Sequence, residues 1–397
     1  MSFEIRPART EEMEEFRRVA AMALVMKPSA FENMLPEWTL CGFEDGKMVT
    51  TFGAWPLMMR WNGNGVSVSG VTSVGTQIAY HRRGYLRRIM TKHFEIMYEK
   101  GEYAVAILLA SWAAIYQRYG YGIVSTRYSY SIEPRHVQFA FPQQIKGSLR
   151  ELGEQETELM VEIYRKFREN RTGYLHRSKP MWSSNVLAPV PPGGSLNRIV
   201  YEEKGIPTGY IVFATIPQPG DIISGHRILI RDLIWLNGEA YRAIWENLSS
   251  LDLIAEIHWQ RAPGDDPLPH LLLEPRRLRA TAVDCLLGRL VDVDKALTQR
   301  KYQEEGELTF GLVDNLCTWN NGSWKLEVSA QGSKMTHTSQ SPQVIMSVST
   351  LALIVFGQIS ATEAMRMGRL DVQKADVLPT WDRIMRTLYK PACADTF

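Results

Sequence analysis

VTSVGTQI (71–78), HRRGYL (81–86) and SWAAIYQRYGYG (111–122) are the segments that decide the fold. The first predicts a β-strand, and the second predicts a tight basic loop that opens a helix. After this loop, apolar residues recur at helical spacing on one face, and charged residues occupy the other face. The apolar face consists of Leu86, Ile89, Met90, His93, Phe94 and Met97. Gly101 ends the helix, and a second apolar strand is predicted from Tyr103 to Ala110.

A strand that turns through a basic, glycine-bearing loop into a helix is suited to binding phosphate. The first turn of a helix carries unpaired backbone N–H groups, and the helix dipole is positive there. Gly84 lets the backbone approach a ligand closely, and Arg82 and Arg83 can pair with phosphate oxygens. The alternative is an ordinary helix start, where arginine and glycine are common. The loop is neither a P-loop nor a dinucleotide fingerprint, because it lacks Gly-Lys-Ser/Thr and has a single glycine.

The loop resembles the Arg/Gln-x-x-Gly-x-Gly/Ala acetyl-CoA motif of the GNAT acetyltransferases, with His81 and Leu86 departing from that pattern. Residues 70–74, the loop itself and IYQRYGYG at 115–122 resemble the Eis (enhanced intracellular survival) family of GNAT N-acetyltransferases. This resemblance implies acetyl-CoA as co-substrate, with no metal. It assigns cofactor binding to Val74, Gly75, Thr76, Arg82, Arg83, Gly84, Tyr85, Leu86, Arg87, Ser111 and Trp112.

The same resemblance implies two catalytic groups. Tyr116 matches the tyrosine that acts as general acid on the leaving thiolate; a phenol of pKa ~10 is a suitable donor to a thiolate of pKa ~8.5. The alternative is that Tyr116 is a packing residue like Tyr119 or Tyr121. The family uses the carboxylate of its last residue as general base, which is Phe397 here, against the alternative of a disordered tail. His81 and His93 are interpreted as structural.

Composition sets wide limits on the function. At about 150 residues per domain, 397 residues suggest two or three domains. The formal net charge of +2 gives no indication of nucleic-acid binding. The four scattered cysteines show no metal spacing and fit a reducing cytosol, so we expect a cytoplasmic protein. No signal segment is recognised, and no apolar run reaches the ~20 residues that span a bilayer.

The expected fold is α+β, with tandem GNAT-like domains whose mixed, mostly antiparallel sheets are flanked by helices. A catalytic GNAT domain is predicted at 1–133, closing with a strand at 125–132, and a degenerate second GNAT-like domain at 134–287. The second domain repeats the strand-strand-strand-helix-strand order, but LNGE at 236–239 has no arginine pair and an acid that repels pyrophosphate. An unrelated α+β domain is the alternative. Residues 288–397 resemble the sterol-carrier-protein-like α/β domain of the Eis family.

The resemblance to the Eis family implies N-acetylation of a small polycationic, aminoglycoside-like amine by direct transfer. The alternatives are a protein-lysine acetyltransferase and a lipid- or ligand-binding protein with a vestigial GNAT domain. The acidic and aromatic residues Phe31, Glu32, Glu37 and Trp38 either line a cationic-substrate pocket or pack as a loop. The penultimate residue is Thr396, and the acidic residue Asp395 stands one position before it. This arrangement bears on how such a substrate is held. The family tends to form hexamers, so a homo-hexamer is expected.

Overall fold

The structure is a computed structural model that describes residues 2–217 and 225–397. The chain divides into two compact units. Unit 1 comprises the chain up to Val124, Leu286–Thr387 and Phe397, and unit 2 comprises Ser125–Cys285 and Leu388–Thr396. Among the described residues, no helix is both long enough and apolar enough to cross a bilayer.

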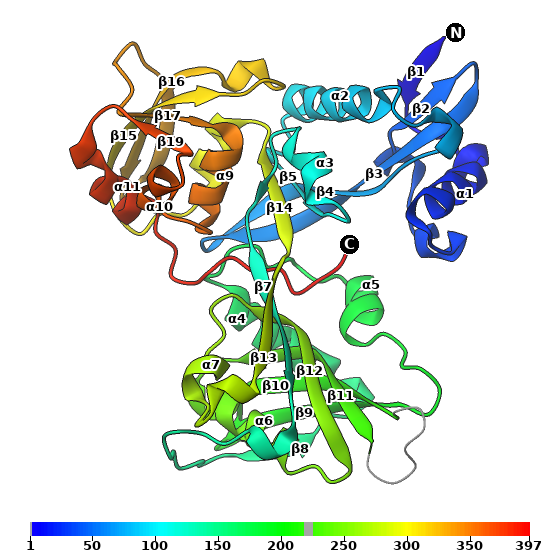
Figure 1. Cartoon of the computed structure of the whole chain (residues 1–397), viewed down its shortest axis with the longest axis vertical. Helices are drawn as coiled ribbons and strands as arrows, with labels where there is room; N and C mark the ends of the chain where they lie inside the picture. Colours follow the sequence, from blue (N-terminus) through cyan, green and yellow to red (C-terminus); the bar gives the residue numbers. More distant parts are fainter. Residues whose placement is uncertain (1, 218–224) are drawn as a thin grey trace. The chain divides into compact units, whose positions relative to one another are not determined.

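The first sheet of unit 1 is mixed, with the strand order β1-β2-β3-β4-β5-β14-β6. Its strands are β1 (Phe3–Arg6), β2 (Cys41–Glu44), β3 (Lys47–Trp61), β4 (Asn64–Thr76), β5 (Val105–Leu109), β6 (Gly122–Ile123) and β14 (Leu286–Leu290). Its helices are α1 (Met13–Leu24), α2 (Tyr85–Lys100) and the short α3 (Ala113–Gln117). As predicted, α2 begins directly after Gly84 and ends at Gly101, where a positive φ of 66° closes the helix. Figure 1 shows β3 and β4 as a long hairpin.

The second sheet of unit 1 has the order β17-β16-β15-β18-β19. It is built from β15 (Gly306–Val313), β16 (Gly322–Ser329), β17 (Gly332–His337), β18 (Val344–Ser347) and β19 (Leu370–Val372). The accompanying helices are α8 (Val293–Gln299), α9 (Val348–Phe356), α10 (Ala361–Arg366) and α11 (Leu378–Met385). Helix α9 packs on β14, and Trp61 Nε1 donates a 3.3 Å hydrogen bond to the Val355 carbonyl. The two sheets of unit 1 are therefore fastened together.

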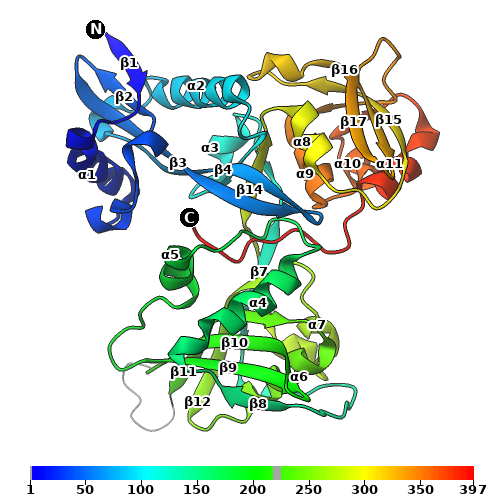
Figure 2. The same ribbon diagram turned by 180° about the vertical axis from the view of Figure 1, so that it is seen from behind.

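Unit 2 has one mixed sheet of order β13-β7-β12-β11-β10-β9-β8. Its strands are β7 (Thr126–Ile132), β8 (Ser148–Glu151), β9 (Ser195–Glu203), β10 (Ile206–Ile216), β11 (His226–Trp235), β12 (Ile254–Pro263) and β13 (Arg279–Asp284). Its helices are α4 (Thr157–Arg168), α5 (Lys179–Met181), α6 (Gly238–Ser249) and α7 (Leu268–Leu271). Side chains of β10 alternate between the two faces: Tyr210 and Val212 pack with α4, and Ile211 and Phe213 pack with α6. Helix α4 packs on β10 and β11, and Figure 2 shows it beside β10.

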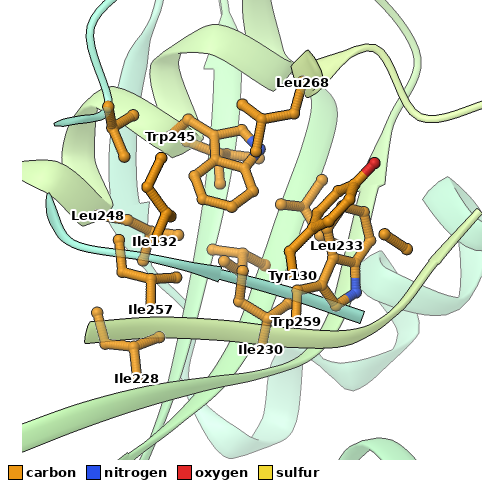
Figure 3. Packing of buried hydrophobic residues seen from close by; sticks show 14 of the residues in the cluster. Tyr130, Ile132, Ile228, Ile230, Leu233, Trp245, Leu248, Ile257, Trp259 and Leu268 are labelled. Atoms are coloured by element: carbon orange, nitrogen blue, oxygen red, sulfur yellow. The ribbon is translucent and has the colours of Figure 1, made fainter. Parts of the chain in front are cut away.

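The core on the α6 face is large and aromatic. Trp245 of α6 packs near Trp259 of β12, with a centroid distance of 6.3 Å, and Tyr130 of β7 lies at the edge of Trp259. Figure 3 shows these rings surrounded by aliphatic side chains such as Ile228 and Leu248. Burial of this apolar surface contributes about 25 cal/mol for each Å² removed from water.

Two strands lie in sheets that their sequence position does not suggest. Strand β7 pairs with β12 and β13 in the sheet of unit 2, although residues 125–132 were expected to close the first domain. Strand β14 follows β13 in sequence but inserts between β5 and β6 in the first sheet of unit 1. The expected boundary at 133 therefore falls after a strand that belongs to the sheet of unit 2, and the expected boundary at 287 falls within a strand that belongs to unit 1. The local sequence of each strand fits either sheet, and pairing decides between them.

A buried ion pair ties β14 to the loop after β15 within unit 1. Nη2 of Arg289 lies 2.8 and 2.7 Å from the two carboxylate oxygens of Asp314, and both side chains are almost fully buried. Asp314 also accepts hydrogen bonds from the backbone of Leu316 and Cys317 and from the Asn320 amide. A buried carboxylate needs such partners, because desolvation of an unpaired charge costs several kcal/mol.

Replacing Arg289 by methionine should lower the free energy of unfolding of unit 1 by about 3–5 kcal/mol, because Asp314 would remain buried without its cation. Arg18→Met is the matched control, since Arg18 forms an exposed pair with Glu15 that is worth less than ~1 kcal/mol. Urea denaturation followed by fluorescence measures both variants. Equal losses for the two would contradict this prediction.

Candidate functional site

The site is organised by the parting of two parallel strands in unit 1. Strands β4 and β5 pair in parallel at Ser69–Ala106 and Gly70–Ile107. From Val71 to Thr76, β4 continues along β3 and does not pair with β5 among the described residues. One edge of this segment therefore presents backbone N–H and C=O groups that can receive an extended ligand.

A β-bulge shapes this open edge. Thr51 pairs with Gly75 and Gly53 pairs with Thr72, so two residues of β4 lie opposite the single residue Phe52 of β3. Ser73 takes a left-handed conformation with φ of 53°, which non-glycine residues rarely adopt. The Thr51 hydroxyl donates to the Ser73 carbonyl at 2.9 Å and holds the bulge in place. Nothing in the sequence singles out Thr51, because it stands in an ordinary strand pattern.

The helix start at Gly84, where phosphate binding was predicted, is sterically open. Gly84 has φ of 78°, and a Cβ at this position would meet no atom within 4 Å, so the backbone is open. Arg82 and Arg87 are exposed, and neither forms an ion pair with a residue in the described ranges. Their guanidinium groups are available to an anion. Leu86 lies half-buried against the core below α2.

Two of the predicted loop residues instead have partners in the protein. The Tyr85 hydroxyl donates to Oε2 of Glu44 at 2.6 Å, and its ring stacks on Phe3 at 4.3 Å. Nη1 of Arg83 lies 3.2 Å from each Glu44 carboxylate oxygen, and its guanidinium lies over the Tyr80 ring. Glu44 therefore fixes the loop, and no local sequence pattern linked it to residues about forty positions later.

Tyr116 lies in α3, half-buried at the edge of the core that contains Tyr121. The two rings meet edge to face with centroids 5.9 Å apart. The Tyr116 hydroxyl makes no hydrogen bond to another described residue, so it is free to act on a ligand. Burial, with a smaller contribution from Tyr119, raises the pKa of Tyr116 to about 12. Ser111 and Trp112 immediately precede α3 and are exposed, Trp112 by 73%.

Phe397 belongs to unit 1, where it lies against the open strand β4. The Thr72 hydroxyl is 3.5 Å from a main-chain oxygen of Phe397. A Cβ on Gly70 would stand 3.1 Å from Cδ2 of the Phe397 ring, so the absence of a side chain at Gly70 makes room for it. This residue is half-buried rather than projecting into solvent. The structure thus brings the last residue to the same strand that carries Val74, Gly75 and Thr76.

A cavity of about 280 Å³ opens in unit 1 beside β3 and α2. Glu37, Trp38, Trp55 and Glu102 are among its lining residues, and the Trp38 and Trp55 rings are 5.2 Å apart. Trp55 pairs with Gly70, the residue against which Phe397 packs. The four residues named within 31–38 therefore do not share one role: two line the cavity and two do not. Glu37 and Trp38 line the cavity, whereas Phe31 is buried against α1 and Glu32 is exposed.

The two histidines named from the sequence have local partners. His93 is buried under α2, with Nε2 3.1 Å from the Ser69 hydroxyl, and His81 Nε2 is 2.9 Å from the Thr76 carbonyl. Burial lowers the pKa of His93 to about 3. Within the described residues, no group of three or more histidine, cysteine or acidic side chains could hold a metal ion.

Comparison with known proteins agrees with this architecture. Residues 4–124 and 173–290 each match a family model described as an acetyltransferase (GNAT) domain, and residues 293–394 match a sterol carrier protein domain. The expected fold class, with a GNAT domain rather than an unrelated fold in the middle of the chain, is confirmed. GNAT domains imply acetyl-CoA as co-substrate.

Full-length relatives extend the similarity. An uncharacterised N-acetyltransferase of Streptomyces coelicolor is 28% identical over 94% of this chain and 89% of its own length. The N-acetyltransferase Eis of Mycobacterium tuberculosis is 26% identical, covering 79% of this chain and 77% of the relative. The crystal structure of Eis1 from Mycobacterium abscessus superposes with a TM-score of 0.83 at 26% identity, covering both chains completely.

The pKa of His93 leads to a test of stability against pH. Between pH 6.5 and about 3, the imidazole is protonated in the unfolded chain but stays neutral in the folded protein. The unfolded state therefore binds more protons, and the wild type should lose up to about 1.4 kcal/mol per pH unit as pH falls through this range. His93→Gln should lose less over the same range. Thermal unfolding from pH 7 to pH 4 measures the two slopes, and parallel slopes would contradict the assignment.

Proposed function

The chain is an N-acetyltransferase of the GNAT type, homologous to Eis, and we propose that it acetylates a primary amine of a small polycationic, aminoglycoside-like molecule. One observation carries the proposal. A main-chain oxygen of Phe397 lies beside Thr72 on the open segment of β4, in the unit that also holds Tyr116 and the Gly84 helix start. A carboxylate, a phenol and a phosphate-binding helix start then serve one reaction.

Unit 1 contains the groups that would hold acetyl-CoA. The amides at the start of α2, with Arg82 and Arg87, are suited to the diphosphate. The open edge of β4 at Val74, Gly75 and Thr76 offers backbone hydrogen bonds to an extended arm. Arg83, Tyr85 and Leu86 support the loop from behind, and Ser111 and Trp112 lie exposed at the end of β5. When bound, acetyl-CoA supplies the acetyl thioester.

The reaction requires proton transfers at both the nitrogen and the sulfur. The substrate nitrogen attacks the thioester carbonyl; a C–N bond forms, the C–S bond breaks, and the electron pair leaves on sulfur. An alkylammonium of pKa ~10.4 must lose a proton before it attacks. The Phe397 carboxylate accepts that proton through water and also attracts the cationic amine. Tyr116 donates its phenolic proton to the thiolate, and the proton that the new amide nitrogen loses after attack returns through water to the Tyr116 phenolate.

The cavity beside Trp38 and Trp55 supports a cationic substrate. Its lining contains two carboxylates, Glu37 and Glu102, against one ammonium, Lys100, and the faces of the two indoles attract ammonium groups. A molecule with several amines can hold one ammonium there while another amine reacts. The cavity of about 280 Å³ suits one ring or one aminoalkyl arm rather than a folded protein surface.

Unit 2 does not bind the cofactor in this proposal, because a side chain of the protein already occupies the start of helix α6. The Asn237 side chain caps α6 by accepting a 2.8 Å hydrogen bond from the Ala240 amide. Oε1 of Glu239 accepts from the Lys146 amide at 2.6 Å and also contacts the Tyr201 hydroxyl. A carboxylate at this position repels phosphate. We therefore assign catalysis to unit 1.

The direct test is release of CoA from acetyl-CoA in the presence of an amine panel containing an aminoglycoside, a polyamine and a lysine peptide. Tyr116→Phe should lower kcat by ~10²–10⁴-fold, the typical contribution of general acid catalysis. Because the pKa of Tyr116 is raised to about 12, its loss of a proton should not reduce the wild-type rate up to pH 10. Tyr119→Phe serves as the neighbouring control. No CoA release by the wild type with any amine would refute the proposal.

Extension of the chain by Gly-Ser after Phe397 should lower kcat at least tenfold, because the carboxylate moves to a residue that Thr72 does not contact. Phe397→Leu keeps the carboxylate at position 397 and should retain most of the activity. Steady-state kinetics with the best amine compare both with the wild type. Full activity of the extended chain would remove the terminal carboxylate from the mechanism.

A further inference from the structure

The second GNAT domain contains the same parting of parallel strands as the first. Strands β11 and β12 pair in parallel from His226–Ile254 to Ile230–Trp259. Beyond the Ile230–Trp259 pair, the described residues of β12 pair with β7, and α6 follows β11 as α2 follows β4. In the first domain, the corresponding segment of β4 is the open edge. Unit 2 therefore has a cleft at the place where the fold accommodates an extended ligand.

This cleft in unit 2 is filled by the chain itself. The cavity that remains there measures about 10 Å³, and Ala394 lines it together with both strands and α4. Nη1 of Arg261, on β12, donates a 2.9 Å hydrogen bond to the Ala394 carbonyl. The segment Leu388–Thr396, which we call the tail, belongs to unit 2 and is part of the red end of the chain in Figure 1. An extended peptide thus occupies the strand opening of the second domain.

A buried ionic cluster holds the tail to β11. Nε of Arg177 is 2.7 Å from Oδ1 of Asp395, and Nη1 of Arg177 is 2.6 Å from Oδ2 of Asp232 on β11. The exposed fractions of these side chains are 1% for Arg177, 0% for Asp395 and 3% for Asp232. Tyr210 donates to Asp232 at 2.5 Å, and the Arg177 guanidinium lies 3.9 Å over the Tyr164 ring.

Backbone contacts fix the tail on both sides of Asp395. The Ala392 amide donates to the Thr172 carbonyl at 3.0 Å. Asn185 accepts hydrogen bonds from the amide and the hydroxyl of Thr396 at 2.9 and 2.6 Å, and its amide donates to the Thr396 carbonyl at 3.2 Å. The last residue before Phe397 is therefore held by three hydrogen bonds to one side chain.

We infer that the strand opening of the second GNAT domain is a dock for the chain's own tail, and that Arg177 acts through Asp395 as a positioning residue for Phe397. Consecutive Cα atoms are ~3.8 Å apart, so fixing Thr396 restricts where the Phe397 carboxylate can go. Apolar residues could fill this space without the free-energy cost of desolvating charges, since a buried ion pair often adds no net stability. Directional bonds instead specify one register of the tail.

The inference about positioning rests on the proposed function, whereas docking of the tail can be tested separately. Asp395→Asn keeps the size of the side chain but removes its charge, while Asp232 remains to pair with Arg177. Docking predicts that carboxypeptidase Y releases Phe397 at least tenfold faster from this variant than from the wild type. Positioning predicts that kcat falls at least tenfold while the KM for acetyl-CoA changes less than twofold.

Tyr241→Phe is the matched control, because it removes a 2.9 Å hydrogen bond to buried Asp266 in the same unit without touching the tail. It should lower the melting temperature but leave Phe397 release and the kcat/KM split at wild-type values. Equal Phe397 release from Asp395→Asn and Tyr241→Phe would overturn docking, even if no amine is acetylated. Faster release with unchanged kcat would overturn positioning and would locate the error in the proposed role of the carboxylate.

Discussion

The early end of parallel pairing between β4 and β5 is the constraint on which the rest of unit 1 depends. A bulge at Ser73, held by the Thr51 hydroxyl, shapes β4 just beyond its last pair with β5 and leaves its backbone groups open. Unpaired N–H and C=O groups on a strand edge attract an extended partner. In this protein that edge lies beside the Gly84 helix start, and Phe397 packs against Gly70 and Thr72 of the same strand.

The second GNAT domain contains the same separation of parallel strands, between β11 and β12, but its surroundings differ. Its parallel strands also part, but the opening is filled by peptide, and the start of α6 is capped by Asn237. The two domains differ in the charge of the side chains around the opening as well as in whether the opening is filled. Free arginines stand near the Gly84 helix start, whereas Glu239 stands at the start of α6 and Asp232 faces the tail. The two GNAT domains thus differ in the side-chain charge at the corresponding helix start.

Local features were predictable because they depend on neighbouring residues. The apolar face of α2, the glycines at both of its ends and the fold class follow from spacing and turn chemistry, and the structure and the matched domains confirm them. Non-local features were not predictable. The partners of β7 and β14, the link from Glu44 to Arg83 and Tyr85, and the Arg177–Asp232–Asp395 cluster join residues that no periodicity connects.

By itself, the sequence predicted helix α2 and the strands before and after it, and it placed an arginine-glycine loop before that helix and a tyrosine after the next strand. Only the tertiary structure decided which of these groups are available. Arg83 and Tyr85 are engaged by Glu44, Arg82 and Arg87 stay exposed, and Phe397 reaches Thr72 across 325 positions of sequence. The reason is physical. Propensity and turn geometry act over a few residues, whereas hydrogen bonding and burial act between any groups that packing brings within about 3–4 Å.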